Sequence, residues 1–398
     1  MALPGARARC HAGGGSGCSG FHARMISQDR DIGTTFRAAG RSLIFLLRAL
    51  PWTAKAIDRV TAAPIIEKFT YPTPTGQGEA DLYRPASPGP HPGLVVSLGV
   101  VPAGIDHPHR ARFGEAVARS GFAALLHWSP GMRDLRLDPA DIGELASAYR
   151  SLIEQPYVDP TRSGMMGTCV GGSFALMSAA DPSIRDRMAF VSAYAPYSSM
   201  WTLARDVATA SRVIDIEREP WRTDPLVWKT FVRSLTERLE TRDTERLRDA
   251  FEDRFTWNAS KTQVLEAAAG LPLDPIGLSA DGRAVLRLLE ATEPDDVDRA
   301  LEQLPSDMKT LLTAMSPITY LSDIHSPLIV LLHDRRDHII PVSESRRLWS
   351  ALSGRPGASY TEMGLQHLDP TRLSPLRLVR ELPKLYFAVF PLYRRTTA

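Results

Sequence analysis

Two parts of this chain alternate short apolar runs with amphipathic stretches. The apolar runs are 93–98, 122–127, 163–167, 189–194 and 327–333. Uncharged runs of this length are typical of strands buried on both faces of a sheet. The other expected elements are helices at 110–120, 140–155, 170–180, 342–352 and about 375–387, and a strand at 359–363. Strands and helices alternating in this way predict an α/β fold with a mainly parallel, doubly wound sheet.

The alternation stops after the fourth run and resumes before the last one. In between, apolar residues recur at every fourth position, as at Val227, Phe231, Leu235 and Leu239, and Arg and Glu occupy the other positions. This pattern is typical of packed amphipathic helices. We therefore expect an inserted all-helical cap between two parts of one α/β core. The boundaries are 65–198 for the first part, 199–315 for the cap and 316–398 for the second part.

The N-terminal region precedes this core. Residues 1–24 contain three arginines, no acidic residue and a run of three glycines, which favours a disordered leader or a misassigned start with Met25 as the true one. We expect residues 25–64 to form a helical segment. The apolar run within 42–52 is too short to span a bilayer. We expect this helix to pack on the domain, with a weak membrane-surface contact through 42–66 as the alternative.

Composition narrows the class of protein. Lys and Arg number 47 and Asp and Glu 45, a net charge of +2, which argues against nucleic acid as the main partner. A hydrophobic fraction of 43% is that of a globular protein. Three cysteines cannot supply a disulfide framework for 398 residues, so we expect a reducing, cytoplasmic location, with a location peripheral to a membrane as the alternative. The oligomeric state does not follow from the sequence.

A cysteine lies in a glycine-rich turn between a predicted strand and a predicted helix. Residues 167–172 read Gly-Thr-Cys-Val-Gly-Gly. A sharp strand-to-helix turn crowds the positions two residues either side, which Gly167 and Gly171 would relieve, leaving Cys169 strained and exposed at the end of the strand. The alternative is a small buried cysteine in a structural turn.

Two further residues follow predicted strands in an informative order. Asp337 lies on the loop after the run at 327–333, and His367 lies 30 residues later, past one helix and one strand. The chain order of nucleophile, acid and histidine is the order used by α/β-hydrolases.

On these residues the sequence resembles the α/β-hydrolase superfamily, and its cysteine box is most similar to that of the dienelactone hydrolase family. The resemblance covers roughly 65–200 and 316–390. It implies that Cys169 is the nucleophile, Asp337 the orienting acid and His367 the general base. It also implies an oxyanion hole formed by the backbone amides of Val170 and, from the loop after an early strand, Val100.

The chemistry implied by this resemblance is cleavage of a carboxylic ester, lactone or thioester of a small molecule through a thioester acyl-enzyme, without a metal or organic cofactor. One alternative is an acyltransferase resembling polyhydroxyalkanoate synthases, which share the cysteine box and an Asp followed by an apolar pair and Pro, as at 337–341. The other is a non-catalytic binding protein on a hydrolase scaffold.

Other polar and aromatic residues have weaker signals. Three aromatic residues follow the ends of predicted strands: Trp128, Tyr194 and Tyr197. We expect them either to line an apolar pocket or to pack in the core. His107 and His109 lack the spacing of known zinc sites, so we expect a polar loop there.

Overall fold

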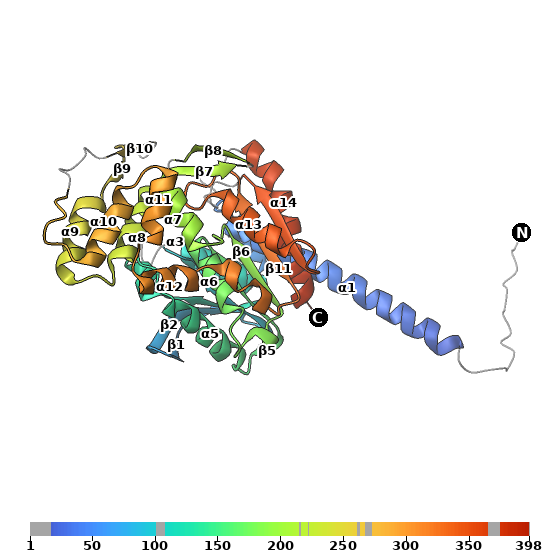
Figure 1. Cartoon of the computed structure of the whole chain (residues 1–398). Helices are drawn as coiled ribbons and strands as arrows, with labels where there is room; N and C mark the ends of the chain where they lie inside the picture. The colour runs from blue at the N-terminus through green and yellow to red at the C-terminus, as the bar shows by residue number, and fades with distance from the viewer. Residues whose placement is uncertain are drawn as a thin grey trace, which may run out of the picture.

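The computed structural model describes residues 17–100, 108–214, 216–221, 223–260, 263–266, 273–364 and 375–397, with side chains from residue 32 onward except at 109 and 375. Its centre is an eight-stranded sheet with the order β1-β2-β4-β3-β5-β6-β11-β12 (Figure 1). The strands are β1 (Ile65–Thr73), β2 (Gly76–Arg84), β3 (His91–Ser97), β4 (Ala123–His127), β5 (Val158–Thr168), β6 (Phe190–Tyr194), β11 (Ile329–Asp334) and β12 (Ala358–Met363).

The sheet is mainly parallel, as predicted. Strands β4, β3, β5, β6, β11 and β12 pair in parallel, and β3, β4, β6 and β11 are buried along their whole length. Strands β1 and β2 form a hairpin, and β2 pairs antiparallel with β4. This hairpin has no single apolar run and was not among the predicted strands. The order reverses at β3, which has β4 on one side and β5 on the other. In open α/β sheets, ligands bind at the carboxyl ends of strands at such a point.

Helices cover both faces of the sheet, so the doubly wound architecture is confirmed. Each face has its own cluster of buried apolar residues. One face packs against α1 (Gly17–Ala49), α3 (Pro108–Arg119) and α14 (Pro375–Thr396), and the other against α5 (Ala140–Ile153), α6 (Val170–Ser178) and α13 (Val342–Leu352). Short elements complete the core: α2 (Ala54–Val60), α4 (Pro130–Arg133), η1 (Arg185–Arg187), η2 (Pro317–Thr319) and η3 (Leu321–Asp323).

A largely helical insertion separates β6 from β11 and lies at one end of the molecule (Figure 1). Its helices are α7 (Met200–Ala208), α8 (Pro225–Thr236), α9 (Thr241–Phe251), α10 (Ala280–Glu290), α11 (Pro294–Glu302) and α12 (Ser306–Ala314). The expectation of an all-helical cap is wrong in one respect, because two short hairpins lie between these helices. They are formed by β7 (Ser211–Ile214) with β8 (Glu217–Pro220), and by β9 (Phe255–Trp257) with β10 (Val264–Glu266).

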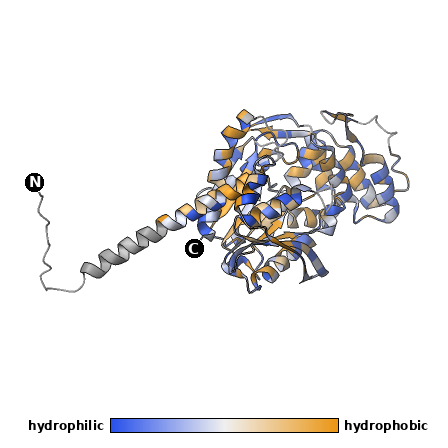
Figure 2. Cartoon of the chain, turned by 180° about the vertical axis from the view of Figure 1, so that it is seen from behind, coloured by the Kyte–Doolittle hydropathy of each residue, from blue (hydrophilic) through white to orange (hydrophobic). Residues whose placement is uncertain are grey.

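The N-terminal helix α1 extends from the body of the protein and packs at its C-terminal part beside α14 (Figure 1). It begins at Gly17, inside the segment 1–24 expected to be a leader; residues 1–16 lie outside the described residues, and that boundary stays a prediction. Phe45 and Leu46 are buried in the apolar cluster on this face of the sheet. Figure 2 shows hydrophobic residues along the part of this helix that joins the body. No helix in the described parts of the chain combines the length and apolarity needed to cross a membrane. The membrane-surface contact through 42–66 also stays a prediction.

The two ends of the insertion meet at one buried carboxylate. Glu344 of α13 is fully buried and accepts hydrogen bonds from the amide and hydroxyl of Ser198, at 2.7 and 2.6 Å, and from the amide of Ser199 at 3.2 Å. The Ser198 carbonyl in turn accepts the amide of Ile318, at 3.0 Å, where the chain returns from the insertion. Arg347 pairs with the same carboxylate. This network fixes the base of the insertion on the core.

Replacing Glu344 by alanine tests this anchor. The change leaves three buried donors without their acceptor and Arg347 without its partner, so we expect the free energy of unfolding to fall by about 3 kcal/mol. Urea denaturation followed by tryptophan fluorescence measures it. The control is Glu302→Ala, at an exposed position on α11, for which we expect little change. Equal stabilities of the two variants would contradict the assignment of Glu344 as an anchor.

Candidate active site

The turn from β5 into α6 holds Cys169 in a strained backbone conformation. Its φ is +56° and its ψ is −136°, a region that non-glycine residues rarely adopt. The Cys169 amide donates to the Tyr194 carbonyl at 2.8 Å, and the Cys169 carbonyl accepts the Gly172 amide at 2.9 Å. These bonds hold the residue between two parallel strands and the helix. Such strain persists only where the surrounding structure fixes it, and it is common at functional sites.

The glycines around this turn allow backbones to approach closely. A Cβ on Gly167 would overlap the carbonyl of Gly171, and a Cβ on Gly171 would overlap the Ser97 carbonyl and lie 2.6 Å from the Gly99 amide nitrogen. Gly99 itself has a φ of +74°, and a Cβ there would lie 2.9 Å from the Thr168 carbonyl oxygen. The crowding predicted for Gly167 and Gly171 is therefore present in the backbone.

This approach brings the two predicted amide donors to the same end of the sheet. Val100 follows Gly99 in the loop after β3, and Val170 is the first residue of α6. Both residues line one cavity together with Cys169. Within the described parts of the chain, neither amide has a backbone acceptor. Their role as oxyanion donors stays a prediction.

Asp337 lies on the loop between β11 and α13 and is 1% exposed. One carboxylate oxygen accepts the amides of Ile339 and Ile340, at 2.7 and 3.1 Å, and both of these residues line the cavity that contains Cys169. His333, a sequence neighbour, is fully buried, and its two ring nitrogens contact the Ser345 hydroxyl at 2.6 Å and the Ile340 carbonyl at 3.0 Å. These bonds give His333 a structural position.

His367 lies outside the described residues, as do Asp106 and His107 and the side chain of His109. The chain enters that segment from β12, whose last residue Met363 pairs with Asp334 of β11. Three residues lie between Met363 and His367 in the sequence, and the four steps along the chain span at most about 14 Å. The role of His367 remains a prediction.

The cavity beside Cys169 has a volume of about 530 Å³ and a mostly apolar lining. Segments far apart in the sequence contribute to it. The apolar lining includes Phe45, Leu46 and Ala49 of α1, Val227 and Phe231 of α8, Leu312 of α12, and Leu378 and Leu382 of α14. Five charged residues also border it: Arg110, Arg112, Asp138, Glu237 and Arg238. Cys169 is only 7% exposed, so the expectation of an exposed cysteine is wrong: the packing around this turn buries it, and it faces the cavity.

The three aromatic residues singled out from the sequence have different positions. Tyr194 lines the large cavity, whereas Trp128 lines a separate pocket of about 20 Å³. Tyr197 lines neither of these two pockets. Burial, with Cys169 and Glu344 nearby, raises the pKa of Tyr197 well above its ordinary value, so its hydroxyl stays protonated. Tyr197 therefore belongs to the packing behind Cys169.

Sequence analysis missed Arg110, which lines both the large and the small cavity. Its guanidinium lies 3.1 Å from the ring centroid of Trp128 and donates to Asp81 at 3.2 Å and to the Leu126 carbonyl at 3.0 Å. Burial lowers its pKa to about 10, so it is cationic at neutral pH. In the sequence, a buried arginine at the start of an amphipathic helix looks the same as a solvent-exposed arginine, so no sequence feature indicated that Arg110 lines the cavity.

Comparison with solved structures identifies the fold. The chain is similar to the Pyrococcus horikoshii acylaminoacyl peptidase, with a TM-score of 0.50 and 13% identity over 86% of this chain and 43% of that one. This is an α/β-hydrolase fold. A 2,6-dihydroxy-pseudo-oxynicotine hydrolase also matches, with a TM-score of 0.49 and 15% identity over 86% of this chain and 71% of that one.

The similarity is one of structure. The chain spans less than half the length of the acylaminoacyl peptidases it matches. No protein-family model and no curated protein matches the sequence. At 13% identity the similarity to the first of these structures shows the fold alone, and the chemistry must be argued from the residues.

Substituting Gly171 by alanine tests the close approach at the turn. The new methyl group would overlap the Ser97 carbonyl, so β3 and α6 must separate, and we expect a destabilisation of about 1–3 kcal/mol. Thermal denaturation measures it. The matched control is Gly143→Ala on α5, where the methyl group meets only Pro74 at 3.5 Å and helix propensity favours alanine. If Gly171→Ala were as stable as Gly143→Ala, the backbone contact would not be a constraint.

Proposed function

We propose that the protein is a hydrolase of the dienelactone hydrolase type, cleaving an ester, lactone or thioester with Cys169 as nucleophile. The observation that carries this proposal is the strained turn at Cys169, which faces an apolar cavity also lined by Val100 and Val170. A sharp strand-to-helix turn of this kind presents the nucleophile in hydrolases of this fold. A purely structural cysteine would need neither the positive φ nor the cavity.

In the proposed mechanism, His367 accepts the proton of the Cys169 thiol as the sulfur attacks the carbonyl carbon. The amides of Val170 and Val100 donate hydrogen bonds to the developing oxyanion. The C–O or C–S bond to the leaving group then breaks, and His367 protonates that group, leaving a thioester on Cys169. A water molecule, deprotonated by His367, hydrolyses the thioester and restores the thiol. Asp337 holds the imidazole in position.

The cavity supports a substrate with an extended apolar part. Its volume of about 530 Å³ lies within the range of small-molecule sites, and helices from the core and from the insertion supply the apolar lining. Burying an apolar chain there is favourable by roughly 25 cal/mol per Å² of surface removed from water. We therefore assign the cavity to the acyl part of the substrate, adjacent to the sulfur.

Replacing Cys169 tests the nucleophile. In a Cys10→Ser/Cys18→Ser background, which leaves Cys169 as the only thiol, we expect hydrolysis of p-nitrophenyl esters and labelling by a thiol-directed acylating probe. Cys169→Ala in this background abolishes labelling and lowers kcat/KM by roughly 10³-fold or more. His367→Ala lowers kcat/KM in the same way. Unchanged hydrolysis in Cys169→Ala would refute the proposal, and CoA release from an acyl-CoA with transfer to an added alcohol would favour the acyltransferase alternative.

Narrowing the cavity tests the acyl assignment. Val227 is half-buried on α8 and lines the cavity, so Val227→Trp reduces its volume without opening the core. We expect kcat/KM for octanoyl esters to fall by roughly 10-fold or more while that for acetyl esters is retained, because the loss of a few buried methylenes costs about 0.8 kcal/mol each. Ile216→Trp, at a 94% exposed position of the insertion, is the control. Parallel loss of both activities would place the acyl chain elsewhere.

A further inference from the structure

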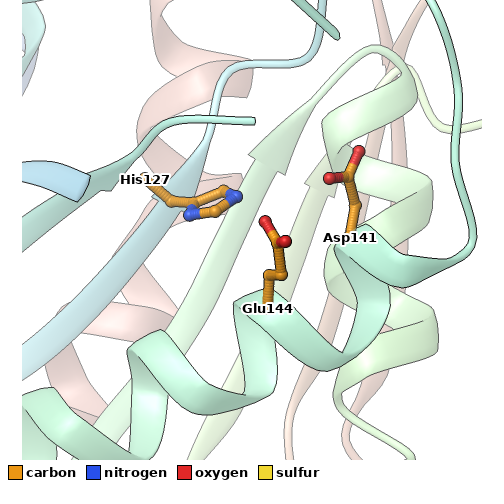
Figure 3. A group of neighbouring side chains, drawn as sticks. All are labelled: His127, Asp141 and Glu144. Carbon is orange, nitrogen blue, oxygen red and sulfur yellow. The ribbon is translucent and has the colours of Figure 1, made fainter. Parts of the chain in front are cut away.

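Three potential metal-binding side chains converge beside the sheet, outside the site described above. His127 is the last residue of β4, and Asp141 and Glu144 lie one turn apart on α5. One ligand atom from each lies within 4.8 Å of the others, and the imidazole points towards the two carboxylates (Figure 3). Spacing of three residues puts both carboxylates on the same side of the helix.

The imidazole of His127 is held with one nitrogen unpartnered. His127 is 5% exposed, and its Nδ1 lies 2.5 Å from the hydroxyl of Tyr71 on β1. Its Nε2 is buried and has no hydrogen-bond partner among the described residues. A metal-ligating histidine commonly has this arrangement, in which one nitrogen is fixed by a second residue and the other faces the metal.

The carboxylates are likewise fixed and lack a cationic partner. Asp141 is 4% exposed and accepts the Ser129 hydroxyl at 2.7 Å, and Glu144 accepts the Thr75 hydroxyl at 2.6 Å. No lysine or arginine of the described chain lies within ion-pair distance of either carboxylate. Each hydroxyl engages one oxygen and leaves the second one available. Two neighbouring carboxylates, one of them buried, are stabilised by a compensating positive charge when both are ionised.

The geometry points to a site for a divalent transition-metal ion formed by His127 Nε2 and one oxygen each of Asp141 and Glu144. Two carboxylates neutralise a divalent charge, and one imidazole with oxygen ligands suits zinc and related ions better than calcium or magnesium. In a tetrahedral site, metal–ligand bonds of about 2.0–2.2 Å place the ligand atoms about 3.3–3.6 Å apart, so the three ligand atoms must move closer together when the ion binds. The half-buried Glu144 can supply this inward movement.

An ion in this position would join three elements of the core. It would connect the end of β4 to the first turns of α5, and through the Tyr71–His127 contact it would hold β1. We therefore assign the site a structural role, separate from the Cys169 chemistry.

Zinc titration of the chelator-treated protein tests this inference. We expect isothermal titration calorimetry to show one equivalent of Zn²⁺ bound, together with a rise in melting temperature. Glu144→Gln, which preserves size and removes one charge, should weaken binding at least 10-fold and remove most of the thermal shift. The control is Glu154→Gln, at the exposed C-terminal end of the same helix, which should bind zinc as the wild type does.

Cobalt distinguishes this site from a thiolate site. Co²⁺ bound by His127 and two carboxylates should give ligand-field absorption without a thiolate-to-metal charge-transfer band, and Cys169→Ala should bind it equally. The inference would be overturned by the absence of zinc binding in the wild type, by binding that Glu144→Gln leaves unchanged, or by a thiolate band lost in Cys169→Ala. None of these results depends on esterase activity, so the proposed function is tested separately.

Discussion

The close approach of three backbone segments at the carboxyl edge of the sheet is the constraint on which the candidate site depends. The loop after β3 meets the β5–α6 turn at Gly99 and Gly171, with no room for a side chain between them. Cys169 therefore leaves the sheet with a positive φ, and its amide is held by Tyr194 of the next strand. Because β3 and β5 are neighbours at the point where the strand order reverses, the same contact creates both the turn and the crevice beside it.

The insertion and the terminal helices add apolar walls to that crevice. Cys169 would lie at an open edge if only the sheet and its own helices were present, but α8, α12, α1 and α14 all contribute to the lining of its cavity. Glu344 fixes the ends of the insertion on the core, so the walls of the cavity keep their positions relative to the turn. Apolar walls lower the local dielectric constant, which strengthens hydrogen bonds to a developing charge.

The sequence was sufficient for the parts of the fold governed by local pattern. Strands such as β6 and β11 are continuous apolar runs, and the helix predicted at 342–352 matches α13, whereas the hairpin of β1 and β2 mixes exposed and buried positions and has no such run. The glycine spacing around Cys169 also predicted a real backbone constraint. The cavity could not be predicted, because its lining combines segments far apart in the sequence, whose proximity follows from tertiary packing. The same holds for His127 and Asp141, which no local motif connects.

The positions of β3 and β4 relate the metal-ligand cluster to the candidate active site. Val96 and Leu126 are paired in register, so the next residues, Ser97 and His127, leave neighbouring strands at the same edge. The chain after Ser97 leads to the loop that packs on the Cys169 turn, while His127 faces α5 on one side of the sheet. Arg110 joins this edge by its bond to the Leu126 carbonyl. An ion at His127 would therefore fix the end of β4 beside β3, the strand whose following loop packs on the Cys169 turn.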